Sequence, residues 1–225
     1  MSQGADQVQY NVMELETIFF DLDATLYPES NGMWAEIRYR IDAYMHERMG
    51  FSTEEIPTLR QSYYKNYGTT LRGLMANYSV DPREYLEFVH DLPLTKYLKP
   101  EPELRRTLLS IPRSRWVFTN SDLDHAQRVL TQMKISDCFD GIVDVFSLEP
   151  YCKPMPEAYQ IAMQMAGMRE PKACALFEDS ASNLSAAHEM GFFTVLVGAN
   201  GMLHSFDRGI KDIHQLREGV PELWM

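Results

Sequence analysis

Two carboxylates one residue apart, Asp21 and Asp23, are the part of this sequence that most clearly suggests chemistry. They follow the short apolar run 15–20, whose aromatic and β-branched residues predict a buried strand. In open α/β sheets, ligands bind at the carboxyl ends of the strands, which is where these side chains would lie. Two neighbouring acids repel each other unless a cation or a substrate compensates them. The pair therefore predicts a site with chemistry rather than a purely structural turn.

Polar residues follow three further apolar runs in the same position relative to each predicted strand. Thr119, Asn120 and Ser121 follow residues 115–118, Lys153 follows residues 142–146 after a short loop, and Glu178 and Asp179 follow residues 173–177. One such group alone is weak evidence, because Asp and Ser often cap helices. The carboxyl ends of parallel strands meet at one edge of a sheet, so we expect all four groups to converge there.

The elements that would position these residues follow two patterns. Strand and helix patterns alternate over residues 115–197, which predicts an α/β fold: a Rossmann-like parallel sheet with helices on both faces. Residues 29–98 show helical periodicity instead, with Thr69 or Thr70 and the pair Asp81-Pro82 as helix starts. We therefore predict an α/β core of residues 14–28 and 99–225, interrupted by an inserted helical cap of residues 29–98. Residues 1–13 are predicted to be a disordered tail.

Composition narrows the choice of partner and compartment. The net charge of −11 argues against a nucleic acid polymer or an anionic membrane surface, but allows a small anionic substrate at a locally positive site. No run approaches the roughly 20 apolar residues of a membrane span, so we expect no membrane insertion. The three scattered cysteines predict reduced thiols in a cytoplasmic protein. The apolar end 223–225 would contact the chain's own core in a monomer or a second copy in a homodimer, so both states are compatible with the sequence.

The ordered set of four groups resembles the haloacid dehalogenase-type phosphohydrolase superfamily. The motifs of that superfamily match Asp21-Leu22-Asp23-Ala24-Thr25, Thr119, Lys153 and Glu178-Asp179. The resemblance covers about residues 15–201, and the helical insertion lies where the superfamily has its cap. Within the superfamily, residues 23–28 and 64–74 resemble the pyrimidine 5′-nucleotidase group, although these segments are less specific than the four motifs.

The resemblance implies a role for each motif residue. Asp21 would be the nucleophile that forms an aspartyl-phosphate, and Asp23 would protonate the leaving group and then deprotonate the attacking water. Mg²⁺ would be held by the Asp21 carboxylate, the Asp23 backbone carbonyl, Asp179, and Glu178 directly or through water. The phosphate would contact Lys153, the Thr119 hydroxyl and the Asn120 backbone N–H.

Local sequence rules give several further expectations. We expect Lys153 and Pro154 to begin a helix, which would add positive potential at the phosphate. We expect Ser121 to cap the helix that follows it, with Asp124 in the reciprocal position. Thr25 is expected to bond the turn after the first strand. The histidines, His90 and His125 among them, show no metal spacing and are expected at the surface or in the core.

Within the predicted cap, Arg72 and Tyr67 are the candidates for substrate binding. Aromatic residues offer stacking surfaces for a nucleobase, namely Trp34, Tyr63, Tyr64, Tyr67 and Tyr78, although most would be ordinary packing between helices. Arg72 follows the predicted turn 68–70 and would reach over the site. These residues would contact the leaving group rather than the phosphate.

The predicted function is that of a Mg²⁺-dependent phosphomonoester hydrolase. The resemblance favours nucleoside 5′-monophosphates as substrates, pyrimidine ones first. The alternatives are another small phosphomonoester (a sugar phosphate or a lysophospholipid), a phosphomutase, and a catalytically silent binding protein on the same scaffold. The key acids and the lysine are all in place, which argues against a silent protein.

Overall fold

A six-stranded parallel sheet forms the centre of the molecule. The computed structural model describes residues 14–198 and 205–225, and the strand order is β3-β2-β1-β4-β5-β6. The strands are β1 (Thr17–Phe20), β2 (Ser114–Phe118), β3 (Gly141–Val143), β4 (Cys174–Glu178), β5 (Phe193–Val197) and β6 (Arg208–Ile210). Phe20 at the end of β1 lies opposite Val117 of β2 and Phe177 of β4. The predicted parallel sheet is confirmed.

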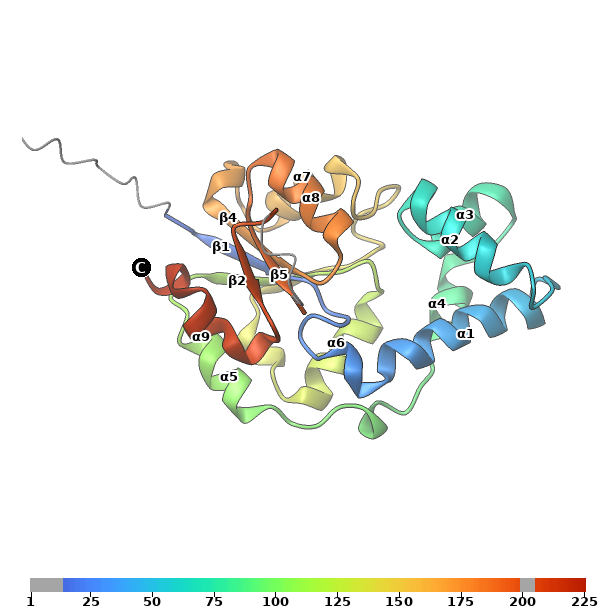
Figure 1. Ribbon diagram of the computed structural model, residues 1–225, viewed down its shortest axis with the longest axis horizontal. Coiled ribbons are helices and arrows are strands. Elements are labelled where there is room, and N and C mark those ends of the chain that lie inside the picture. The colour runs from blue at the N-terminus through green and yellow to red at the C-terminus, as the bar shows by residue number, and fades with distance from the viewer. Residues whose placement is uncertain (1–13, 199–204) are drawn as a thin grey trace, which may run out of the picture.

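Helices cover both faces of this sheet (Figure 1). One face carries α5 (Pro102–Leu109), α6 (Leu123–Met133) and α9 (Leu216–Gly219), and the other carries α7 (Pro156–Met165) and α8 (Ala181–Met190). Alternate residues of β1 separate accordingly, with Ile18 and Phe20 in the first hydrophobic cluster and Phe19 in the second. Because both faces are buried, β1 reads as a continuous apolar run and not as an alternating one.

The first four of the α-helices that follow β1 in the chain form a group beside the sheet, which we call the helical insert (residues 29–98). They are α1 (Met33–Glu47), α2 (Ile56–Tyr67), α3 (Thr70–Asn77) and α4 (Pro82–His90). The Thr69 side chain accepts a hydrogen bond from the Arg72 N–H and caps α3, and Asp81 caps α4 through the Arg83 N–H. Both helix starts were predicted from the sequence.

Short 3-10 segments connect the larger elements. They are Glu29–Asn31, Leu94–Lys96, Ser136–Cys138, Pro171–Ala173, Ile213–Gln215 and Pro221–Trp224. Leu223 in the last of them is fully buried against the chain's own core, and the Trp224 indole donates to the Ser110 carbonyl oxygen over 3.0 Å. The predicted tail, residues 1–13, lies outside the described residues.

Two predicted helix starts are wrong. The helix after Lys153 begins at Pro156 with Met155 at its N-cap, because residues 152–155 form a separate turn in which the Met155 N–H donates to the Cys152 carbonyl. Asp122, not Ser121, caps α6, since its carboxylate accepts the His125 N–H over 2.8 Å. Strand β6 and helix α5 were not predicted. Among the described residues, no helix has the length and apolar character needed to cross a membrane.

Candidate active site

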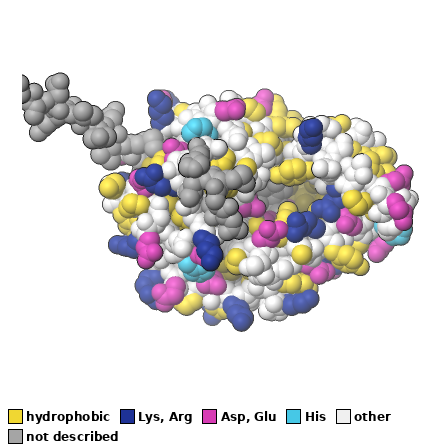
Figure 2. All heavy atoms as spheres, in the orientation of Figure 1, with side chains coloured by type: hydrophobic (Ala, Val, Ile, Leu, Met, Phe, Trp, Pro, Cys, Tyr) yellow, Lys and Arg dark blue, Asp and Glu magenta, His cyan; other side chains and the backbone are white. Residues whose placement is uncertain are grey.

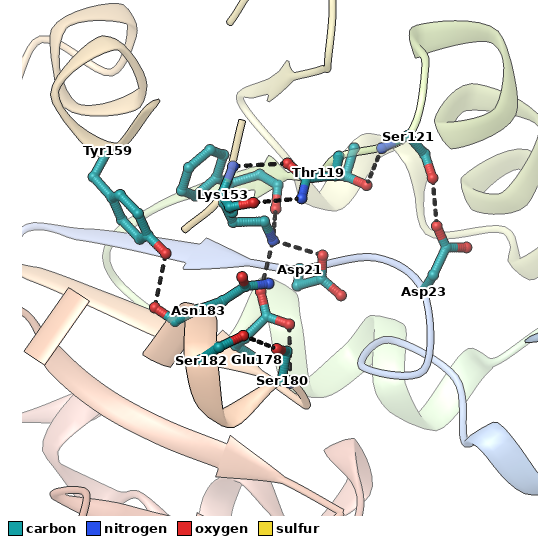
Figure 3. A network of polar contacts seen from close by, with 12 residues as sticks. Asp21, Asp23, Thr119, Ser121, Lys153, Tyr159, Glu178, Ser180, Ser182 and Asn183 are labelled. Atoms are coloured by element: carbon teal, nitrogen blue, oxygen red, sulfur yellow. Dashed lines mark hydrogen bonds and ion pairs between the residues drawn. The ribbon is translucent and has the colours of Figure 1, made fainter. Parts of the chain in front are cut away.

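Residues from all four predicted groups meet at the carboxyl edge of the sheet, among them Asp21, Asp23, Thr119, Lys153 and Glu178 (Figure 3). Asp21 follows β1 directly, and its backbone N–H donates to the Phe177 carbonyl of β4 over 2.9 Å. This bond holds Asp21 beside the end of β4, where Glu178 and Asp179 follow. The next turn places Ala24 at a φ of 64°, a left-handed conformation that is strained for a residue with a Cβ. Thr25 bonds this turn through its backbone N–H, which donates to the Leu22 carbonyl at 3.4 Å, whereas its hydroxyl is buried without a hydrogen-bond partner among the described residues.

Lys153 is a buried cation at the centre of the site. Only 1 % exposed, it donates through Nζ to Asp21 Oδ1 at 2.7 Å, Glu178 Oε2 at 2.6 Å and the Phe118 carbonyl at 2.8 Å. Burial by itself would lower the pKa of Lys153, but the Asp21 and Glu178 carboxylates hold it above its usual range. The ammonium therefore stays charged and compensates the acids around it.

Asn120 and Thr119 follow β2 and have different hydrogen-bond partners. The Asn120 amide clamps the Lys153 backbone, accepting its N–H at 2.9 Å and donating to its carbonyl at 3.0 Å. The side chain of Asn120 therefore positions Lys153, a function that the sequence did not indicate. The Thr119 hydroxyl oxygen accepts the Ser121 N–H at 3.0 Å, which leaves its hydrogen to donate to a ligand in the cavity.

Three acids form a cluster that fits a metal ion. Asp21, Glu178 and Asp179 each offer a carboxylate oxygen, and these atoms lie within 4.8 Å of one another. Burial, reinforced by the neighbouring carboxylates, raises the pKa of Asp21 to about 7 and the pKa of Asp179 to about 9. Three carboxyl groups beside one ammonium leave room for a further cation, and oxygen-only donors suit a hard divalent one such as Mg²⁺. The donor set is therefore compatible with the predicted cofactor.

The side chain of Asp23 is held apart from this cluster. Its Oδ1 accepts the Tyr27 hydroxyl at 2.6 Å and contacts His125 Nε2 at 2.9 Å. Its Oδ2 accepts the Ser121 hydroxyl at 2.6 Å (Figure 3). Although burial acts to raise the pKa of Asp23, His125 and the hydrogen bonds hold it below its usual range. Ser121, predicted as a helix cap, contacts this carboxylate instead.

Sequence reasoning missed two histidines beside Asp23. His90, at the end of α4, and His125, in α6, stack with ring centroids 3.9 Å apart and an interplanar angle of 18°. His90 Nδ1 also lies 2.5 Å from Asp122 Oδ2. Both rings are buried, as a core role would require, but they form a polar network that ends on Asp23. The one available signal was that His125 lies three residues after Asp122, on the apolar face of its predicted helix.

A cavity of about 550 Å³ lies between the helical insert and the site. Figure 2 shows the surface hollowed there, with hydrophobic and charged side chains around the opening. One side is lined by the site residues Asp21, Asp23, Thr119, Lys153 and Asp179. The other side is lined by residues of the helical insert, among them Trp34, Ile37, Arg38, Ile41, Arg60, Gln61, Tyr64, Leu71, Leu86 and Val89. The wall opposite the acids is therefore mostly apolar, with two guanidinium groups.

The candidate substrate-binding residues divide between the cavity and its surroundings. Trp34 and Tyr64 line the cavity, whereas Tyr63, Tyr67, Tyr78 and Arg72 are not among its lining residues. The Arg72 guanidinium donates to the Tyr151 carbonyl at 3.1 Å and lies 3.9 Å from Glu149, so it fastens the insert to the loop before α7. The Tyr67 ring packs against the hydrophobic core.

Comparison with known proteins supports one family. A family model described as haloacid dehalogenase-like hydrolase matches residues 15–191. Phosphate metabolism protein 8 of Saccharomyces cerevisiae is 32% identical over 195 residues, which is 80% of this chain and 61% of the yeast protein. The chain thus spans less than two thirds of that relative.

Solved structures share the fold at low sequence identity. A HAD phosphatase from Thermococcus onnurineus has a TM-score of 0.59 at 17% identity, with 91% of this chain and 97% of that chain covered. β-Phosphoglucomutase from Clostridium difficile has a TM-score of 0.59 at 20% identity, covering 90% and 93%. The HAD-hydrolase YfnB from Bacillus subtilis, bound to magnesium, has a TM-score of 0.59 at 14% identity, covering 91% and 98%.

Proposed function

Since this chain belongs to the haloacid dehalogenase-like hydrolase family, we propose that it is a Mg²⁺-dependent phosphomonoester hydrolase that acts through an aspartyl-phosphate on Asp21. The observation that carries the proposal is the position of the Lys153 ammonium. It lies 2.7 Å from Asp21 Oδ1 and 2.6 Å from Glu178 Oε2, beside the Thr119 hydroxyl and at the bottom of a cavity. A buried cation next to a nucleophilic carboxylate offsets the repulsion of an incoming phosphate dianion.

The reaction has two steps that use the same residues. An Asp21 oxygen bonds to phosphorus while the bond to the leaving oxygen breaks. Asp23, which takes up a proton from solvent as the anionic phosphate binds beside it, gives that proton to the leaving oxygen. Water then attacks phosphorus, Asp23 takes a proton from it, and the bond between Asp21 and phosphorus breaks to release inorganic phosphate. Lys153 and the Thr119 hydroxyl stabilise the oxygens of the phosphoryl group in both steps.

Mg²⁺ would be held by the carboxylates of Asp21 and Asp179, the Asp23 backbone carbonyl, and Glu178. When bound, it would neutralise charge on the phosphoryl oxygens. Both Glu178 oxygens already accept hydrogen bonds, one from Lys153 Nζ and the other from the Ser180 N–H. This favours a contact of Glu178 with the ion through water rather than a direct one.

The helical insert acts in this proposal as a cap domain of residues 29–98 over a core of residues 14–28 and 99–225. The substrate class is a nucleoside 5′-monophosphate, with pyrimidines first. A flat base would stack on Trp34 or Tyr64 within the apolar wall. Arg60, whose Nε is buried without a partner among the described residues, would donate to a base carbonyl. Arg72 and Tyr67 would affect the substrate only through the position of the insert.

The test is Mg²⁺-dependent phosphate release from UMP, CMP, AMP, GMP, a sugar phosphate and lysophosphatidate. We expect the parent to prefer UMP and CMP and Asp21→Asn to lose at least about 10³-fold while it still folds. Preference for another ester would keep the mechanism and discard the nucleotide. Residual Asp21→Asn activity within about tenfold of the parent would refute the covalent intermediate. No release from any ester would favour a binding protein.

A further inference from the structure

The contact between His125 and Asp23 points to a function for this histidine. The His125 side chain is fully buried, and its Nε2 lies 2.9 Å from Asp23 Oδ1. The Tyr27 hydroxyl also donates to Oδ1, so this oxygen acts as an acceptor and Nε2 carries the hydrogen in this contact. The other ring nitrogen, Nδ1, has no hydrogen-bond partner among residues 14–198 and 205–225. Within that part of the chain, Asp23 is therefore the single hydrogen-bonding partner of this imidazole.

The His125 ring is fixed from two sides. Its backbone N–H donates to Asp122 Oδ1 at 2.8 Å, which sets the start of α6. The other oxygen of Asp122 lies 2.5 Å from His90 Nδ1, and the His90 ring stacks on the His125 ring at 3.9 Å. Asp122 thus orients both the backbone of His125 and the ring that packs on it. Such support around one hydrogen-bond donor is what a precisely oriented partner requires.

We propose that His125 is a positioning residue for Asp23, fixing the orientation of the carboxyl group that exchanges protons with the leaving group and with water. This inference rests on the phosphoryl-transfer chemistry proposed above, but not on the identity of the substrate. His125 and Tyr27 both occupy Oδ1, whereas Oδ2 has the Ser121 hydroxyl as its partner. A hydroxyl can accept as well as donate a hydrogen bond, so Ser121 tolerates either state of Oδ2. Oδ2 is therefore the oxygen that gives and takes the proton.

The proposal makes the effect of His125 depend on the leaving group. An alkoxide, such as the 5′-oxygen of a nucleoside, leaves only if it is protonated, so its departure needs a correctly oriented Asp23. A 4-nitrophenolate is stable as an anion and needs little help. The kcat/KM value reports the steps up to transfer of the phosphoryl group to Asp21, and excludes the later hydrolysis, which Asp23 also serves.

The experiment compares His125→Gln with His125→Asn. The Gln amide nitrogen reaches about as far as imidazole Nε2, whereas the shorter Asn amide reaches only about as far as Nδ1, so the pair differs in reach and not in polarity. For His125→Asn we expect kcat/KM to fall about 10²-fold on UMP or glycerol 1-phosphate, and less than about threefold on 4-nitrophenyl phosphate. We expect His125→Gln to stay within about fivefold of the parent on all three.

A double mutant separates positioning from folding. If His125 acts through Asp23, His125→Asn should lower kcat/KM by less than about twofold further when Asp23 is already Asn. Equal losses on alkyl and aryl esters, equal losses in the Gln and Asn variants, or full additivity with Asp23→Asn would each overturn the inference. If His125→Asn does not fold, His90→Phe keeps a ring stacked on His125 but removes the Asp122 contact, and should show a smaller loss with the same dependence on the leaving group. A parent that hydrolyses none of the three esters would instead refute the proposed function itself.

Discussion

Replacing Lys153 by methionine should destabilise the fold strongly, and the loss should depend on pH. Methionine fills a similar volume but leaves Asp21 and Glu178 buried without their cation and the Phe118 carbonyl without its donor. Two charge-assisted hydrogen bonds contribute roughly 1.5–3 kcal/mol each, and an unsatisfied buried acceptor costs about 1–3 kcal/mol. Part of this is recovered because the ammonium no longer has to be buried, so the net loss should be about 3–5 kcal/mol. For a chain of this length, that lowers Tm by roughly 6–20 °C.

The pH dependence follows from the carboxylates that remain. Burial first, and then repulsion by Glu178, already raises the pKa of Asp21 to about 7 in the parent, and loss of Lys153 raises it further. A group whose pKa is higher in the folded than in the unfolded state lowers stability as pH rises above its unfolded value. The gap between parent and variant should therefore be smaller at pH 5, where the acids are protonated, than at pH 8.

The assay is thermal unfolding of Lys153→Met at pH 5 and pH 8, with and without Mg²⁺. Lys172→Met is the matched control, because Lys172 is exposed and the same atoms are changed there. Added Mg²⁺ should restore part of the lost stability by compensating the acid cluster. A Lys153→Met variant that melts within about 2 °C of the parent at pH 8, or that loses equally at both pH values, would refute the reasoning.

Two further predictions concern the contact of the helical insert with the core at Gly68, and the contact between Asp122 and His90. A Cβ on Gly68 (φ 83°) would lie 2.8 Å from the Lys153 carbonyl oxygen, whereas one on Gly50 (φ 76°) meets nothing within 4 Å. Gly50→Ala should therefore cost only the backbone strain of about 1–2 kcal/mol. Gly68→Ala should cost about 1–3 kcal/mol more and lower kcat/KM tenfold or more. Denaturant unfolding and kinetics measure these differences, and equal effects of the two substitutions would contradict the prediction. Burial acts to raise the pKa of Asp122, but the contact with His90 outweighs it and lowers the pKa to about 2. Asp122→Asn keeps the helix cap but loses this contact, and should lower the stability of the fold by roughly 2 kcal/mol at pH 5. A carboxyl group whose pKa is lower in the folded state stabilises the fold above its unfolded pKa, and this stabilisation is lost as the pH falls. The difference in stability between parent and Asp122→Asn should therefore close towards pH 2. A difference that does not change with pH would contradict the assignment.

The sequence alone determined the parallel sheet and the edge at which the motif residues meet. Its strands are buried on both faces, so their apolar runs stand out, and the order of strand and helix patterns leaves little choice of topology. Local signals also determined where two helices of the insert begin, since Thr69 and Asp81 cap them through backbone groups two or three residues away. Such contacts within a few residues can be predicted from spacing alone.

Only the tertiary structure decided which side chains serve the site from other elements. Lys153 meets Asp21, Phe118 and Glu178 from three strands, His125 meets Asp23 across about a hundred residues of chain, and Ser121 turns to Asp23 instead of capping α6. Periodicity predicts which helix face carries Tyr67 or Arg72. It does not predict whether that face lies against the cavity or against a neighbouring loop. The physical reason is that a residue's spacing fixes its orientation within its own element, whereas its partners depend on how the elements pack against one another.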